Sequence, residues 1–118
     1  MFAVDYIDLL RRLSVQDEWL AAEAAGGTAT SGLGMSLDAK TMSLVRLAAL
    51  VAVGGAGPSY GAQSDAAVDA GATSDEIVDV LVAVIPVVGL PCVVAAAPKL
   101  ALALGHDVDD AFGVRPGA

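Results

Sequence analysis

Residues 56–77 read AGPSYGAQSDAAVDAGATSDEI, and three features of this stretch predict two consecutive helices joined by a turn. Pro58 suits the first turn of a helix, where its missing N–H is not needed. Gly71 is placed to end that helix, because glycine readily adopts the backbone conformation of a helix C-terminus. Thr73 and Glu76 then form a capping-box pattern, which is typical of the start of the next helix.

The helix that follows Thr73 is predicted over residues 74–85, because its apolar side chains recur on one face. Those side chains belong to Ile77, Val80, Leu81, Val84 and Ile85. An uncharged run of nineteen residues then extends over 80–98, which is just long enough to span a membrane. Pro86, Gly89 and Pro91 would leave backbone groups unsatisfied in hydrocarbon. We therefore expect two buried helices joined by a short turn, the second opening at Pro91 and ending at Gly105, and no membrane partner.

Upstream of the opening stretch, Asp38 is a natural N-cap for a helix to about Val53. Only Arg46 carries a charge between residues 44 and 53, so we expect this helix to be buried on nearly all sides, in the middle of the domain or at a subunit interface. Residues 26–34 are small and polar, and are predicted to be a linker that could also cover a pocket.

The N-terminal residues predict two short helices. Apolar side chains recur at spacings of three and four in the first, at Phe2, Tyr6, Ile7, Leu10 and Leu13. Ser14 with Asp17 predicts the cap of a second helix, which runs to about residue 25. The fold class is therefore all-α, with about six helices. We expect N-terminal helices and a linker over 1–36, a helical core over 37–105 and a tail over 106–118.

Composition limits the partners and the location of the protein. The 118 residues carry a net charge of −8, and 56% of them are apolar. Such an acidic chain without a Lys/Arg cluster disfavours nucleic acid as a partner. A small domain cannot hide so much apolar side chain alone, which favours a homo-oligomer. One cysteine and no apolar leader preceded by basic residues indicate a cytoplasmic protein.

Three framing segments resemble the carboxymuconolactone decarboxylase superfamily, which includes the alkyl hydroperoxidase D branch. They are residues 37–44 (LDAKTMSL), residues 65–77 (DAAVDAGATSDEI) and residues 89–91 (GLP). The resemblance covers about residues 37–104 and leaves the N-terminal part of the chain out. It implies a helical bundle of the alkyl hydroperoxidase D type, assembled as a trimer or a hexamer.

The residues that carry the chemistry of that superfamily are replaced here. Where the peroxidase branch has a Cys-x-x-Cys-x-x-x-His array, this chain has Ala56, Ser59 and Gln63. The resemblance also implies a carboxylate in the preceding helix, two residues after the Lys-Thr pair, and this chain has Ser43 there. In the decarboxylase branch, the resemblance implies a histidine at the Gln63 position and a glutamate near Ser59, and both are missing. A tyrosine two places before the Gly-x-Pro is Val87 here.

These replacements argue against redox and proton-transfer chemistry. A disulfide-cycling peroxidase needs two sulfurs within bonding reach, and Cys92 is the one cysteine of the chain. A glutamine amide cannot exchange protons near neutral pH, so Gln63 could bind a substrate but could not relay its protons. We therefore predict no cofactor and no metal.

The helix predicted between Pro58 and Gly71, here called the motif helix, lies where the family's array would be. The candidate ligand-binding residues are those on or near it that can still form hydrogen bonds or ion pairs. Ser59, Tyr60 and Gln63 share a helix face, and Ser43 and Arg46 on the preceding helix could join them. Polar groups that merely fill the family's catalytic space are an equally good interpretation. No residue is predicted to be catalytic. Cys92 is interpreted as a small buried apolar residue, and His106 as a helix-end residue beside Asp107, Asp109 and Asp110, a weak candidate for a metal site.

Two functions remain open on this sequence. The first is a family member without catalysis, which serves as a non-redox ligand-binding or structural oligomer. The second is a lyase or isomerase acting on a small apolar carboxylate or lactone, with Arg46 pairing with the carboxylate and the catalysis provided by electrostatic stabilisation. A thiol peroxidase that uses Cys92 is a third and weaker hypothesis.

Overall fold

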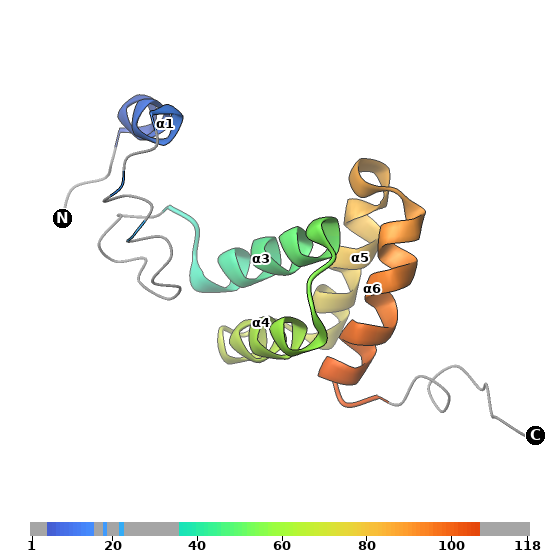
Figure 1. Ribbon diagram of the computed structural model, residues 1–118. Helices are drawn as coiled ribbons and strands as arrows, with labels where there is room; N and C mark the ends of the chain where they lie inside the picture. The colour runs from blue at the N-terminus through green and yellow to red at the C-terminus, as the bar shows by residue number, and fades with distance from the viewer. Residues whose placement is uncertain (1–4, 16–17, 19–21, 23–35, 107–118) are drawn as a thin grey trace, which may run out of the picture. The chain divides into compact units, whose positions relative to one another are not determined.

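The computed structural model describes residues 5–15, 18, 22 and 36–106 of the chain (Figure 1). The contacts between residues divide the chain into two units, Met1–Asp38 and Ala39–Ala118. The described part consists of helices and turns, without a strand, which confirms the predicted all-α class.

In the first unit, helix α1 extends over Tyr6–Ser14. Asp5 caps it, because its Oδ1 accepts a hydrogen bond of 3.1 Å from the Ile7 amide. Ser14 is the last residue of α1, and its hydroxyl donates to the Leu10 carbonyl at 2.8 Å. The prediction that Ser14 caps a second helix is therefore wrong. Of the rest of that predicted helix the structure describes residues 18 and 22, which are helical, and the predicted linker over 26–34 lies outside the described residues.

Four helices follow within residues 36–106: α3 (Ala39–Val53), α4 (Gly57–Asp69), α5 (Ser74–Val88) and α6 (Leu90–Ala103). Helices α5 and α6 lie side by side and are joined by a tight turn, as Figure 1 shows. Helix α3 contacts α4 and α5, and α4 also contacts α6. The core between them contains Leu47, Val51, Tyr60, Ala67, Ala72, Ile77, Leu81, Val93, Ala96 and Leu100.

The turn between α4 and α5 follows the sequence signals closely. Gly71 has a φ of 99°, and the Ala72 amide donates to the Ala67 carbonyl at 2.9 Å, which closes α4 in a Schellman motif. The predicted capping box is confirmed: the Thr73 hydroxyl accepts from the Glu76 amide at 3.1 Å, and the Thr73 amide donates to the Glu76 carboxylate at 2.9 Å. Thus these local interactions set where α4 ends and where α5 begins.

Helix α5 continues three residues beyond its predicted end. Pro86 lies inside it and removes one backbone N–H, but the Gly89 amide donates to the Ile85 carbonyl at 2.9 Å and completes the last turn. Pro86 cannot donate to the Val82 carbonyl four residues before it, yet the helix continues past it to Val88. Helix α6 then begins at Leu90 with Pro91 in its first turn, as predicted, and continues through Pro98 to Ala103.

Helix α3 is buried on one side, which differs from the prediction of burial on nearly all sides. Met42, Ser43, Leu47 and Val51 face the core, whereas Val45 is 53% exposed and Val53 is 78% exposed. The sequence shows only that the residues are apolar, and not which of them meet a neighbouring helix of the same chain. Among the described helices, none is both long and apolar enough to cross a membrane.

Candidate functional site

The start of α4 is tied to α6 by one long-range hydrogen bond. The Lys99 ammonium donates to the Gly55 carbonyl at 3.0 Å, and 44 residues separate the two along the chain. Gly55 immediately precedes Ala56, which is the N-cap of α4 and makes no side-chain capping bond. Lys99 therefore places a cation beside the first turn of the motif helix. Sequence reasoning missed Lys99, because no pattern links it to residues so far away.

The five predicted site residues lie on two helices that contact each other, α3 and α4. Ser43 and Tyr60 are buried, with 6% and 1% of their surfaces exposed. Arg46 and Gln63 are half-buried, and Ser59 is exposed. The structure thus buries two of the five residues in the core, while it directs Ser59 to solvent.

Tyr60 is part of the hydrophobic core. It belongs to the same buried cluster as Leu47, Val51 and Ile77, which lie on α3 and α5. Burial raises the pKa of the Tyr60 hydroxyl above its ordinary value, and burial is the sole cause of this shift. The hydroxyl therefore stays protonated near neutral pH, where it can donate a hydrogen bond but cannot act as a base.

Helix α4 directs a stripe of three residues into the core, namely Tyr60, Ser64 and Ala67. Ser64 is 1% exposed, and its hydroxyl has no hydrogen-bond partner among the described residues. The Oε1 atom of Gln63 is also buried and without a partner in the described part. An unsatisfied buried polar group costs about 1–3 kcal/mol, so the unpaired oxygen atoms of these two adjacent residues destabilise the folded chain.

Sequence reasoning did not identify Ser64. The available signal was its position four residues after Tyr60, which places both on the same side of a helix. A serine on a helix is usually read as a surface residue, so the helical phase around Tyr60 was needed to predict its burial.

The groups able to ligate a metal or react as a thiol are dispersed. Cys92 is a free cysteine, and it is half-buried rather than fully buried as predicted. No three metal-binding side chains gather anywhere in the described ranges. Three members of the weak metal-site candidate, Asp107, Asp109 and Asp110, lie outside those ranges.

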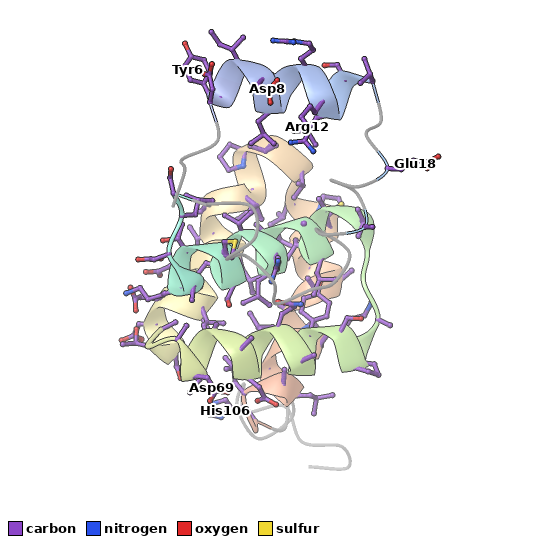
Figure 2. All side chains as sticks on the ribbon, turned by 90° about the vertical axis from the view of Figure 1, so that its left-hand side faces the viewer. Tyr6, Asp8, Arg12, Glu18, Asp69 and His106 are labelled. Atoms are coloured by element: carbon purple, nitrogen blue, oxygen red, sulfur yellow. The ribbon has the colours of Figure 1, made fainter. Side chains whose placement is uncertain are left out.

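A cavity of about 530 Å³ lies between α5 and α6. Its lining consists of Ser74, Asp75, Val78, Leu81, Ala97, Leu100, Ala101, Leu104 and His106. None of the five predicted site residues is part of this lining. His106, which Figure 2 labels at the end of the helical unit where α6 ends, is the one histidine of the chain, and it lines this cavity.

A second Schellman motif fixes the backbone of His106. Gly105 has a φ of 87°, and the His106 amide donates to the Ala101 carbonyl at 2.9 Å. The bond closes the C-terminal turn of α6 and directs the chain back along the helix end. The sequence pattern located this helix end correctly, but it could not show that the end borders a cavity.

Comparison with known proteins gives one result. The model of the "Carboxymuconolactone decarboxylase family" matches residues 17–102. The match begins well before residue 37, so the expectation that the N-terminal part contributes nothing to the resemblance is wrong. No curated protein and no solved structure matches the chain. Since the family model covers most of the 118 residues, the chain belongs to the carboxymuconolactone decarboxylase family.

Proposed function

We propose that this family member is not a catalyst and serves as a non-redox ligand-binding or structural oligomer. The observation that carries the proposal is the burial of Tyr60. Its side chain is 1% exposed and packs in the core, and the array positions on either side of it, Ser59 and Gln63, carry no group that ionises near neutral pH. A hydroxyl that is enclosed in the packed core is closed to a substrate, because ligand sites are open clefts or cavities.

The chemistry of the neighbouring residues supports the same conclusion. Ala56, Ser59 and Gln63 have no group that ionises near neutral pH, and the Tyr60 hydroxyl stays protonated. General acid–base catalysis requires a group that gains and loses a proton near the working pH. With a single cysteine, a disulfide cannot form within one chain.

The proposed assembly is a homo-oligomer, a trimer or a hexamer, located in the cytoplasm. Several large apolar side chains of α3, α5 and α6 are more than half exposed, and they are Val45, Val53, Val82, Val87, Leu90, Val94 and Leu102. Exposed apolar surface of this extent is typical of a protein that binds another protein surface. The proposed core of each subunit is the segment 37–105.

A second candidate is a lyase or isomerase of the decarboxylase type acting on a small carboxylate or lactone. Two observations favour it: Gln63 has a buried Oε1 without a partner, and Arg46 is half-buried on the helix packed against α4. A substrate hydroxyl could donate to that oxygen, while the guanidinium paired with a carboxylate.

Two assays distinguish the proposal from both enzymatic hypotheses. The full chain and its Cys92→Ala variant are incubated with cumene hydroperoxide and dithiothreitol, and hydroperoxide loss is followed. We expect both to match the protein-free rate. Small carboxylates and lactones are then incubated with the chain in D₂O, and deuterium incorporation is followed by NMR. Protein-dependent incorporation that is lost in Gln63→Ala, or hydroperoxide loss that requires Cys92, would contradict the proposal.

A further inference from the structure

The cavity between α5 and α6 combines an apolar floor with a polar rim. Six of its lining residues are apolar, namely Val78, Leu81, Ala97, Leu100, Ala101 and Leu104. The remaining three can accept hydrogen bonds, namely Ser74, Asp75 and His106. The volume of about 530 Å³ falls within the range of small-molecule sites, which are mostly apolar with a few placed polar groups.

The shape of the floor follows from the residues that face it. Ala97 and Ala101 lie four apart on α6, so they share one face of that helix, and their small side chains leave space opposite Val78 and Leu81 of α5. Larger residues at the two alanine positions would fill the cavity. The hollow is therefore a consequence of side-chain size at two positions of α6.

The rim decides which ligand head group fits. Asp75 carries a carboxylate that makes no ion pair within the described part of the chain. The lining contains no lysine and no arginine. An ammonium group would have a carboxylate, a hydroxyl and an imidazole nitrogen as acceptors, whereas a ligand carboxylate would meet like charge.

The helix dipoles do not reverse this preference. The cavity lies between the N-terminus of α5, which favours anions, and the C-terminus of α6, which favours cations. Each end carries about half an elementary charge, so the two contributions oppose each other, while Asp75 carries a full charge. The net charge of −8 acts in the same direction as Asp75.

We infer that the α5–α6 cavity binds a small molecule with a compact hydrocarbon body and one ammonium group, which Asp75 recognises. This inference names a site and a ligand class for the ligand-binding role proposed above, and it rests on that proposal. The ligand class differs from the carboxylate or lactone considered for the Tyr60 region. The two regions can therefore be told apart by the head group that they prefer.

Three probes with one hydrocarbon ring test the inference: cyclohexylamine, cyclohexanol and cyclohexanecarboxylate. Each is titrated into the full chain at one fixed pH of about 8, and methyl NMR shifts are followed. We expect the amine to shift the methyl groups of Val78, Leu81, Leu100 and Leu104. The amine should bind about tenfold more tightly than the carboxylate. The preference is modest because the Asp75 carboxylate is partly exposed, so it attracts the ammonium group and repels the ligand carboxylate only weakly.

Two variants and one matched control locate the site. Asp75→Asn should reduce the preference for the amine over the carboxylate to about twofold or less, while cyclohexanol affinity stays unchanged. Ala101→Phe should abolish binding of all three probes by filling the cavity. Asp65→Asn removes the same charge from α4, outside the cavity lining, and should leave the preference intact.

Several results would overturn the inference. They are equal affinities for the three head groups, methyl shifts outside the cavity, or unchanged binding in Ala101→Phe when its circular dichroism spectrum is native. If Ala101→Phe does not fold, the test is the preference for the amine over the carboxylate in Asp75→Asn, and an unchanged preference would overturn the inference. Catalytic turnover in the assays above would defeat the proposed function but would leave these binding results as they are, so the two failures are distinguishable.

Discussion

Tyr60 illustrates how one residue can be chosen for the right region and assigned the wrong environment. The sequence places it on the motif helix, among groups able to form hydrogen bonds, which makes it a natural ligand-binding candidate. The structure places its ring among Leu47, Val51 and Ile77. Because the pattern of apolar residues in α4 is weak, only the packing of α3 and α5 against it reveals which side of the helix is interior.

The first prediction separates a packing role of Tyr60 from a hydrogen-bonding role. Tyr60→Phe keeps the ring and should change the free energy of unfolding by less than about 1 kcal/mol. Tyr60→Ala leaves a cavity and should cost about 3–5 kcal/mol. Urea denaturation followed by circular dichroism measures both values. Equal losses in the two variants would mean that the hydroxyl is essential to a polar network.

The free energies of unfolding of the wild-type chain and of Tyr60→Phe should also depend differently on pH. Because burial raises the pKa of Tyr60 in the folded state above its unfolded value of about 10, the folded protein holds this proton more tightly. The resulting stability is fully present below pH 10 and is lost as the pH rises beyond it. The wild-type chain should therefore lose more stability than Tyr60→Phe above about pH 10.

Ser64, Gln63 and His106 mark the limit of what the sequence could predict about sites. Whether the side chains of Ser64 and Gln63 are buried depends on which side of α4 faces the core. An error of one residue in that assignment rotates the predicted buried side by about 100° around the helix axis. His106 depends on the packing of α6 against α5, since the cavity that it lines exists only when the two helices meet. The relation between His106 and the cavity leaves no local pattern in the chain, and the spacing of Ser64 from Tyr60 is informative only once Tyr60 is known to be buried.

At the scale of helices, the sequence predicted the boundaries best where a local interaction sets them. Three such local signals can be read from neighbouring residues of the sequence and are present in the structure. They are the Thr73–Glu76 capping box, Pro58 in the first turn of α4 and Gly71 after the end of α4. The end of α5 was predicted too early, because the helix continues through Pro86 to Val88 although proline usually breaks a helix.

Glu76 also joins two helices. Its Oε2 lies 2.8 Å from the Lys40 ammonium near the start of α3, while its Oε1 accepts from the Thr73 amide at the start of α5. The hydrogen bond from Lys40 is the largest cause that lowers the pKa of Glu76, and the Thr73 amide adds to it. The carboxylate thus stabilises the start of α5 and its contact with α3 together.

The second prediction follows from that lowered pKa. Because the Glu76 carboxyl titrates lower in the folded state, its contribution is present above the unfolded pKa of about 4.3 and is lost as the pH falls through the folded value. Glu76→Gln should therefore flatten the acid limb of a plot of unfolding free energy against pH. Denaturation at several pH values between about 6 and 3 measures it, with Asp65→Asn as the control.

A companion variant isolates the cap itself. Thr73→Ala removes the hydroxyl that accepts from the Glu76 amide and should cost about 1 kcal/mol at neutral pH. Its acid limb should resemble that of the wild-type chain, because Lys40 still faces Glu76. A flattened acid limb in Thr73→Ala would instead assign the pH dependence to the cap.

For the whole molecule, the open question is what covers the apolar surface. A chain with 56% apolar residues leaves Val82, Val87 and Val94 more than 60% exposed on α5 and α6. The sequence predicted this excess from composition, but it could not say which faces remain uncovered. These three valines all belong to the uncharged run 80–98, which forms the end of α5 and the first part of α6.

The third prediction concerns assembly. Light scattering coupled to gel filtration should give a mass two or more times that of the 11.7-kDa chain, with a trimer or a hexamer expected. Val94→Glu should shift it toward the monomer, because burying an unpaired carboxylate in an interface is strongly unfavourable. Val68→Glu is the matched control, since exposed Asp65 and Asp69 already make that side of α4 polar. A monomeric wild-type chain, or equal effects of the two variants, would contradict the prediction.

The exposed first turn of α4 bears on how such a chain can change over generations. Ser59 lies at the surface, so exchanging it alters the free energy of unfolding by no more than about 0.5 kcal/mol. Mutations that remove or restore a reactive group at this position hardly change the stability of the fold. Tyr60, the next residue, is buried in the core, so its exchange is costly. Chemistry at this helix can therefore drift while the scaffold persists.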